Sequence, residues 1–344
     1  MAPPDLRRPV VTTALRWALI GASDIASTRV VPAMRALGHS VDAVYSGSAE
    51  RAQRYAADNG IAFGSSDLAE LLALDIDAVY VSSHNDLHHS QAIAAIAAGK
   101  HVLCEKPLAL SIDDAENMVA AADEAGVVLA VNHHLPFSPV HQRVRELVQS
   151  GAIGKVLSVR IGHAVLLPER LRGWRTGGAR GGGVALDITC HDASVLNPLL
   201  GRARRVTALG VKQGPWAGDT ADAIMTVIEY DNDGDAVIAQ THDAFTIAFD
   251  TTSFTVHGSE GSLFGRNAMT QDSAGTLELV DESGRSEVPL ELGRNLYEII
   301  LTAFAAATRG EGAPTVSGRD GVETLRVALA AQESITTGQT IHLC

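Results

Sequence analysis

The stretch LRWALIGASDIA, residues 15–26, decides how the first part of this chain folds. It opens with a short, mostly apolar run, turns at Gly21 and continues into a helix-forming pattern over residues 24–38. An apolar strand that passes through a glycine turn directly into a helix is typical of the first unit of a doubly wound α/β sheet.

The same alternation of apolar runs and alanine-rich stretches continues to about residue 135. Strands that are apolar on both faces and alternate with helices form a parallel sheet covered on both sides. We therefore predict an α/β Rossmann dinucleotide-binding domain over residues 15–135, after a disordered lead at residues 1–14. The further strands are SVDAVYS (40–46), DAVYVSS (77–83), HVLCE (101–105) and VVLAVN (127–132), and the helices span 49–60, 88–98 and 111–126.

The second part of the chain has runs in which apolar and polar residues alternate. They follow one another through turns such as DNDGD (231–235), which favours an antiparallel sheet with one open face. We predict an α+β domain over residues 136–344 with a large, mostly antiparallel open sheet, whose last helix can pack back on the first domain. The expected strands are KVLSVRIGHAV (155–165), RRVTALGVK (204–212), DAIMTVIEY (222–230), DAVIAQTHDA (235–244), TTSFTVHG (251–258) and TLELV (276–280). Helices are expected at 140–150, 184–199, 294–309 and near the end.

Composition excludes several classes of protein. The net charge is −13 and the 27 Lys and Arg residues form no long run, which argues against a nucleic-acid partner. No apolar run is long enough for a membrane span. The three cysteines have no paired spacing, which favours a reducing, cytoplasmic location, and no CxxC or HExxH pattern predicts a metal site.

The turn after the first strand has the arrangement of a dinucleotide site. Gly21 supplies the tight turn, while Ser23 and Ala26 take the places of the second and third glycines of G-x-G-x-x-G. A helix N-terminus at this point favours an anion such as a pyrophosphate. The motif alone is weak, and an ordinary strand–helix turn is the alternative.

The end of the second strand predicts the form of the dinucleotide. NAD-preferring folds place Asp or Glu there for the ribose 2′-hydroxyl, whereas this chain has Ser46, Gly47 and Ser48, followed by Arg51. A carboxylate about 4 Å from a 2′-phosphate would cost roughly 1 kcal/mol in water and about 4 kcal/mol at a partly buried site. Its absence and the guanidinium favour NADP(H), unless Arg51 is only a surface helix residue.

Two segments carry the chemistry. In AGKHVLCEKPLAL (98–110), the triplet Glu105-Lys106-Pro107 ends a parallel strand, where ligands bind in open α/β sheets, and the proline can set a fixed turn, cis included. In GGGVALDITCHDASVLNPLLG (181–201), Asp187 and His191 are four residues apart and would share a helix face.

These segments, with HQRVRELVQSGAIGKVLSVR (141–160), resemble the Gfo/Idh/MocA oxidoreductases over nearly the whole chain from Leu15. The resemblance implies that Lys106, Asp187 and His191 are catalytic. Lys106 would stabilise the developing alkoxide, His191 would supply or relay the proton, and Asp187 would orient and charge-balance the pair.

A closer resemblance is to the NADPH-dependent members that reduce 1,5-anhydro-D-fructose, through GASDIA, VYVSSHNDLHHSQ (79–91), VNHHL (131–135) and HAVLLPERLRGWR (163–175). It implies a small carbohydrate ketone as substrate. The implied substrate-binding residues are Lys106, His133, His163, Trp174, Asp187 and His191. The implied cofactor-binding residues are Gly21, Ala22, Ser23, Asp24, Ile25, Ser46, Arg51, Ser82, Ser83, His84, Asn85, Leu87, His88, Glu105, Lys106, Asn132, Trp174, Arg175 and Tyr297.

The sequence is also compatible with two other functions and with a homo-oligomer. The chain could instead be an NAD(P)-dependent dehydrogenase of an inositol, a pyranose or a dihydrodiol. A non-catalytic regulator that senses dinucleotide is a further alternative, although such a protein should lack Lys106 or His191, and both are present. The open sheet of the second domain allows a homo-oligomer.

Overall fold

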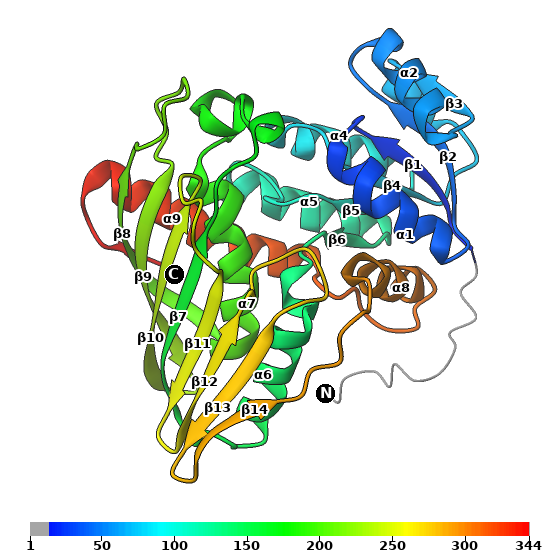
Figure 1. Ribbon diagram of the computed structural model, residues 1–344. Coiled ribbons are helices and arrows are strands. Elements are labelled where there is room, and N and C mark those ends of the chain that lie inside the picture. The colour runs from blue at the N-terminus through cyan, green and yellow to red at the C-terminus, as the bar shows by residue number, and fades with distance from the viewer. Residues whose placement is uncertain (1–13, 344) are drawn as a thin grey trace.

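The computed structural model describes residues 14–343, so the predicted disordered lead lies outside the described residues except for Ala14. Two β-sheets lie side by side, each covered by helices (Figure 1). The first sheet is parallel, with strand order β3-β2-β1-β4-β5-β6, which confirms the predicted Rossmann domain. Its strands are β1 (Arg16–Ile20), β2 (Ser40–Tyr45), β3 (Phe63–Ser65), β4 (Ala78–Val81), β5 (His101–Cys104) and β6 (Leu129–Val131).

Local sequence signals set the helices of this domain. Ser48 and Ser111 are N-caps, whose side chains accept hydrogen bonds from the backbone of the first turn, and Gly60 and Gly126 end the same two helices in the left-handed conformation. Sequence analysis missed β3 and the helix after it, because both are very short. The helices are α1 (Val31–Ala36), preceded by a π-helical turn (Ala26–Val30), α2 (Ala49–Asn59), α3 (Leu68–Leu72), α4 (His88–Ala97) and α5 (Ile112–Ala125).

The second sheet has the order β14-β13-β12-β11-β7-β10-β9-β8-β15 and is antiparallel except where β7 pairs with β10. The predicted turn joins β9 to β10, with Asp233 and Gly234 both at positive φ. Sequence analysis did not name β12, β14 or β15 as strands; β14 is largely polar and β15 is very short. The strands are β7 (Val156–Ala164), β8 (Arg202–Val211), β9 (Ala223–Asn232), β10 (Asp235–Ala244), β11 (Ser253–Gly258), β12 (Gly261–Arg266), β13 (Thr276–Asp281), β14 (Gly284–Val288) and β15 (Ile341–His342).

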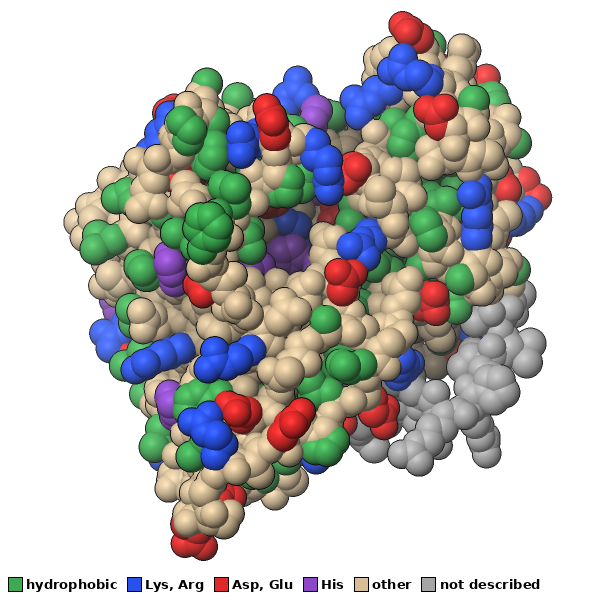
Figure 2. All heavy atoms as spheres, viewed as in Figure 1, with side chains coloured by type: hydrophobic (Ala, Val, Ile, Leu, Met, Phe, Trp, Pro, Cys, Tyr) green, Lys and Arg blue, Asp and Glu red, His purple; other side chains and the backbone are tan. Residues whose placement is uncertain are grey.

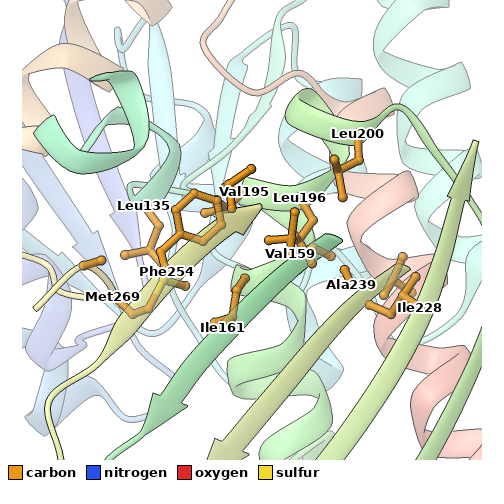
Figure 3. Packing of buried hydrophobic residues seen from close by; sticks show 14 of the residues in the cluster. Leu135, Val159, Ile161, Val195, Leu196, Leu200, Ile228, Ala239, Phe254 and Met269 are labelled. Carbon is orange, nitrogen blue, oxygen red and sulfur yellow. The ribbon is translucent and has the colours of Figure 1, made fainter. Parts of the chain in front are cut away.

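One face of this sheet is packed and the other is open. On the packed face, α6 (Pro139–Gln149) and α7 (Cys190–Leu200) contribute to a core in which Leu196 lies near Val159 (Figure 3). The open face carries apolar side chains that are about half exposed or more. They include Leu157, Leu209, Val211, Met225, Val227 and Ile238.

The last two helices return to the first domain. In α8 (Leu296–Thr308), Phe304 packs on Trp17 of β1, with ring centroids 5.1 Å apart. In α9 (Gly318–Thr337), Leu325 joins the core beneath α5 and β6. The predicted boundary at 135/136 separates the two domains along the sequence. In the folded chain, α8 and one face of α9 also pack into the first domain. No helix among residues 14–343 is long and apolar enough to cross a membrane.

Candidate active site

The loop after β1 forms a close-fitting cradle against the loop after β4. Gly21 has φ +116°, and a Cβ there would lie 2.7 Å from the backbone of Ser82 and Ser83. Ser23 Oγ donates a hydrogen bond to Ser82 Oγ at 2.8 Å and accepts one from the backbone of Ala26 at the start of the first helix. Only glycine allows this approach of two backbones, and the helix N-terminus beside it suits a pyrophosphate.

Arg51 lies beside this cradle. Its Nη2 donates to the backbone oxygen of Ala22 at 2.8 Å, and its other guanidinium nitrogens make no hydrogen bond within the described part of the chain. Ser46 is buried at the end of β2, next to the N-terminus of α2. The nearby carboxylate of Asp24 is already paired with Arg170, at 2.8 Å. The predicted cofactor residues here thus form a cationic site without a free carboxylate.

The loop after β4 is divided between open and buried side chains. His84 packs edge-on against Trp174, with centroids 5.4 Å apart, and contacts Arg180, a residue that sequence analysis did not select. Burial and then Arg180 lower the pKa of His84 below its usual value. Leu87 is partly exposed.

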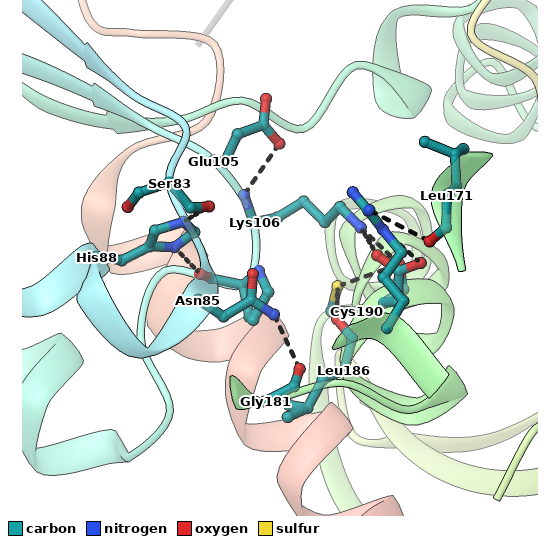
Figure 4. A network of polar contacts seen from close by, with 12 residues as sticks. Ser83, Asn85, His88, Glu105, Lys106, Leu171, Gly181, Leu186 and Cys190 are labelled. Atoms are coloured by element: carbon teal, nitrogen blue, oxygen red, sulfur yellow. Dashed lines mark hydrogen bonds and ion pairs between the residues drawn. The ribbon is translucent and has the colours of Figure 1, made fainter. Parts of the chain in front are cut away.

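Two other predicted cofactor residues of this loop instead hold neighbouring loops together (Figure 4). His88 is fully buried, with Nδ1 2.8 Å from the backbone oxygen of Pro107 and Nε2 3.3 Å from that of Ser83. Asn85 donates through Nδ2 to the oxygen of Gly181 at 2.9 Å. Because these polar atoms contact the backbone of neighbouring loops, His88 and Asn85 hold the loops in place and are not free to bind a ligand through those atoms.

The Glu-Lys-Pro triplet begins directly after β5. Glu105 Oε1 accepts hydrogen bonds from Tyr80 Oη and from Asn132 Nδ2, the latter at 2.6 Å. Glu105 Oε2 accepts from the backbone N–H of Lys106 at 3.3 Å. The bond between Lys106 and Pro107 is cis, as the sequence suggested. Glu105 therefore fixes the end of β5, from which the lysine side chain extends.

Lys106 reaches across to the second domain (Figure 4). Its Nζ donates to Asp187 Oδ1 and to the Asp187 backbone oxygen, both at 2.7 Å. Burial opposes the ammonium charge, but the attraction of Asp187, Cys190 and Glu105 outweighs it and raises the pKa of Lys106. Burial likewise opposes the carboxylate, but Lys106 and then Arg175 outweigh it and lower the pKa of Asp187. An ammonium has three N–H donors, so one remains for a ligand.

Asp187 contacts Lys106, one member of the pair that it is expected to orient, and makes no hydrogen bond or ion pair with His191. Asp187 lies in a π-helical turn (η7, Ala185–Thr189) that precedes α7, so the four-residue spacing does not produce the alignment of a regular α-helix. The ionic partners of Asp187 in the described chain are Lys106 and Arg175, whose Nε is 3.8 Å away. Arg175 in turn stacks on Trp174, 4.5 Å from the ring centroid.

His191 lies in a cluster of histidines. Its ring centroid is 5.5 Å from that of His133, 5.0 Å from that of His134 and 6.3 Å from that of His163. Burial lowers the pKa of His133 and His134 to about 3 and that of His163 to about 4, and it holds the pKa of His191 well below its usual value. All four rings are therefore neutral near pH 7.

The four rings differ in their access to the site. His191 and His163 are 9% exposed, whereas His133 is 0% exposed and has Nε2 3.2 Å from Thr324 Oγ1. His133 is thus closed off from solvent, while part of His191 remains exposed. His134, which the sequence-based set of site residues omits, stacks on Tyr297 with centroids 5.5 Å apart. The sequence signal that could have identified His134 is the pair of adjacent histidines directly after a strand end.

Figure 2 shows a hollow between the two halves of the molecule, with histidine and Lys or Arg side chains at its floor. A separate cavity of about 630 Å³ lies between α6, α7 and α9, lined by residues such as Phe137, Asn197 and Thr324. It contains none of Lys106, Asp187 and His191. Within residues 14–343, no group of three or more His, Cys, Asp or Glu side chains is arranged so that it could hold a metal ion.

A nucleotide cradle on a Rossmann sheet that faces a buried lysine–aspartate pair defines a dinucleotide-dependent oxidoreductase. A model described as the oxidoreductase family with an NAD-binding Rossmann fold matches residues 15–133, and the GFO/IDH/MocA C-terminal domain matches residues 141–264. The chain belongs to the Gfo/Idh/MocA oxidoreductase family.

Two relatives and one solved structure illustrate the likeness. The chain is 46% identical to a 1,5-anhydro-D-fructose reductase of Ensifer adhaerens, over 95% of this chain and 98% of that protein. It is 30% identical to a D-xylose 1-dehydrogenase (NADP(+)) of Haloferax volcanii, over 96% of this chain and all of the relative. The aldose-aldose oxidoreductase of Caulobacter crescentus, solved with glycerol, superposes with a TM-score of 0.85 at 25% identity, covering 96% of this chain and 100% of that one.

Proposed function

We propose that this protein reduces a sugar-derived ketone of the 1,5-anhydro-D-fructose type, to a product such as 1,5-anhydro-D-mannitol, with NADPH as hydride donor. The observation that carries the proposal is the Lys106 ammonium, which is held by Asp187 with one N–H donor to spare. It lies at the carboxyl end of β5, where open α/β sheets bind ligands.

NADPH bound in the cradle would supply the hydride that converts the ketone carbon to an alkoxide. The free N–H of Lys106 donates a hydrogen bond to the carbonyl oxygen and gives up its proton as the alkoxide forms. Asp187 keeps the ammonium charged before the step and properly directed. His191, neutral and 9% exposed, accepts a proton from solvent and returns it to the lysine.

The preference for NADP(H) rests on Arg51 and on Ser46, Gly47 and Ser48, which stand directly after β2 where an NAD site has an acidic residue. With Asp24 engaged by Arg170, the guanidinium of Arg51 is left to attract the 2′-phosphate. Arg180, Arg51 and Arg175 all help to lower the pKa of His84, so positive charge gathers near this loop. A phosphate group is therefore favoured there over a free hydroxyl.

The substrate is proposed from the 46% identical reductase. A pyranose dehydrogenase is the second candidate, favoured by the 30% identical D-xylose 1-dehydrogenase, and inositols or dihydrodiols would fit the same chemistry. A dinucleotide sensor without catalysis is disfavoured, because Lys106 and His191 are both present and lie in one site.

The test is a turnover assay that follows NADPH absorbance with 1,5-anhydro-D-fructose, osones and other ketoses, and follows NADP⁺ reduction with inositols, pentopyranoses and dihydrodiols. We expect anhydrofructose or a close osone to give the highest kcat/KM. A polyol that is oxidised at least tenfold more efficiently would replace the substrate assignment. Tight NADPH binding without turnover on any compound would favour the sensor.

We also propose that the protein is a homo-oligomer and works in the cytoplasm. The open face of the second sheet carries apolar side chains such as Leu209, 76% exposed, and Val227, 47% exposed, which a second copy would cover. Cys104 and Cys190 are free and buried, as suits a reducing compartment. Sedimentation of the wild type against Leu209→Asp tests the first point, since a monomeric wild type would refute it.

A further inference from the structure

A group of buried polar side chains lies behind His163 and takes no part in the proposed reaction. Asp192 in α7 and Asp243 in β10 are both 0% exposed. Asp243 is the direct neighbour of His163 in the register between β10 and β7. His163 Nδ1 lies 2.7 Å from Asp192 Oδ1, so helix and sheet meet through these three residues.

Each of the two carboxyl groups has one oxygen with a hydrogen-bond partner and one buried oxygen without a donor among the described residues. Asp243 Oδ2 accepts hydrogen bonds from Thr189 Oγ1 at 2.5 Å and Thr241 Oγ1 at 3.2 Å. Asp192 Oδ2 and Asp243 Oδ1 are buried, and no other group of residues 14–343 donates to them. His163 contacts Asp192 and is paired in register with Asp243, which brings the two carboxyl groups together, and each affects the pKa of the other. One proton between them would satisfy both oxygens.

The surroundings offer no cation to balance two charges. His163 is the only basic side chain that pairs with either aspartate among the described residues. On the neighbouring strand, Tyr230 donates its hydroxyl to Asn197 instead. The remaining ionisable groups nearby are Cys190 and, beyond His163, the Lys106–Asp187 pair, which is already matched in charge. Two adjacent buried carboxylates without a counter-ion cannot both remain ionised.

Burial acts in the same direction on both groups. It raises the pKa of Asp192 to about 7 and, with the contribution of Asp192, raises the pKa of Asp243 well above its usual range. Burial also lowers the pKa of His163 to about 4, so this imidazole is neutral and carries its proton on one nitrogen only.

We propose that Asp192 and Asp243 share one proton and act as a positioning pair that fixes the His163 proton on Nδ1, which leaves Nε2 as a hydrogen-bond acceptor in the substrate cavity. With the shared proton between the inner oxygens, Asp192 Oδ1 can only accept, so Nδ1 of His163 must donate. His163 is 9% exposed, and within residues 14–343 only its Nδ1 has a hydrogen-bond partner, which leaves Nε2 for a ligand.

The inference deepens the proposed function and rests on it for the identity of the ligand. An acceptor nitrogen at His163 binds a hydroxyl group of the substrate and repels a carbonyl oxygen. Lys106, a donor, binds the carbonyl oxygen. His163 and Lys106 thereby distinguish the ketone of the substrate from the alcohol groups beside it, and a polyhydroxylated substrate can bind in the correct orientation only if they are distinguished.

The experiment is a measurement of histidine tautomers by long-range ¹H–¹⁵N NMR on the full chain near pH 7, without ligand. His163 is assigned by the signal that disappears in His163→Gln. We expect the Nδ1–H tautomer in the wild type and in Asp243→Asn, because the amide group introduced by that substitution would donate to Asp192 Oδ2 in place of the shared proton. Asp192→Leu removes the acceptor, and we expect His163 to change to the Nε2–H form, which neutral histidine favours in water.

An Nε2–H tautomer or an imidazolium at His163 of the wild type would overturn the proposal, and so would an unchanged tautomer in folded Asp192→Leu. Asp243→Asn tests the shared proton separately, because a neutral replacement should be tolerated. A loss of more than about 10 °C in Tm near pH 7, several kcal/mol for a chain of this size, would show that Asp243 is needed as a charge. If Asp192→Leu fails to fold, the other two proteins still decide. Neither the NMR measurement nor the Tm measurement needs substrate, so a failed turnover assay counts only against the proposed function.

Discussion

Lys106 and Asp187 are 81 positions apart in the chain, yet Nζ and Oδ1 are 2.7 Å apart, and the pair joins the two domains. Each side chain is mostly buried, with exposed fractions of 13% and 17%. Each therefore depends on the other to remain charged. The proposed chemistry and the closure of the domain interface rest on the same contact.

Removal of the ammonium should abolish turnover and spare the cofactor. We expect Lys106→Met to lower kcat by about 10²-fold or more, as with the loss of a transition-state donor, while NADPH affinity changes little. Stopped-flow turnover and NADPH fluorescence titration measure the two effects. Lys155→Met, which loses an exposed ion pair with Asp235, is the control. If Lys106→Met kept more than a few per cent of turnover, the lysine would not be the donor.

Loss of the carboxylate should change the pH profile. Asp187 raises the pKa of Lys106, so in Asp187→Asn that pKa falls. Because the charged lysine is the active form, activity is lost as pH rises through its pKa, and in the variant this loss should begin at a lower pH. The pH dependence of kcat/KM in both proteins tests this. A coincident alkaline limb would argue against Lys106 as the titrating group.

The guanidinium of Arg51 should determine the dinucleotide preference. We expect Arg51→Gln to weaken NADPH binding by about 10- to 100-fold, one or two charge-assisted contacts, and to leave NADH binding nearly unchanged. Calorimetric titration with both dinucleotides gives the ratio. Arg54→Gln, one turn along the same helix, is the matched control, because Arg54 pairs only with Glu50 among the described residues. Equal losses for NADPH and NADH would assign Arg51 a purely structural role.

Gly21 should tolerate no side chain. A Cβ at this position lies 2.7 Å from backbone atoms and requires φ +116°, so Gly21→Ala should cost several kcal/mol or displace the loop and eliminate dinucleotide binding. Gly47→Ala, where a Cβ meets nothing within 4 Å, is the control. Denaturant unfolding and NADPH titration measure both. Normal NADPH affinity in Gly21→Ala would exclude the cradle as the pyrophosphate site.

The histidine cluster should make the protein sensitive to acid. Burial lowers the pKa of His133 to about 3, whereas an unfolded histidine titrates near 6.5. Its contribution to stability is thus complete above about pH 6.5 and is lost as pH falls toward 3, by up to about 1.4 kcal/mol per pH unit. His133→Gln should flatten this dependence in urea titrations, and His342→Gln, an exposed residue, should not. Parallel pH curves for His133→Gln and the wild type would contradict the prediction.

Local patterns predicted most of the elements. The strand–turn–helix at residues 15–38, the serine caps and the alternating runs of the second part depend on interactions between near neighbours, and these elements were found within a few residues of their expected bounds. The strand β3 was not predicted, because a run of three residues is too short to show an alternation of apolar and polar residues. The likeness between AGKHVLCEKPLAL and the family indicated Lys106 before any geometry was known.

Other features required the folded chain. The four-residue spacing predicts that Asp187 and His191 share the face of a regular α-helix, whereas Asp187 lies in a π-helical turn and pairs with Lys106. The tripeptide His-Asp-Ala occurs at residues 191–193 and 242–244, but nothing in either copy shows that the two aspartates meet.

Residues within one or two turns of the chain are sufficient to predict the two fold classes, the glycine turn and a lysine at a strand end. Which charges pair, which histidines stay partly exposed and that α8 packs on the first domain emerge only in the folded chain. Those outcomes depend on burial and on contacts between distant segments, and pKa values respond to that burial, which no local pattern encodes.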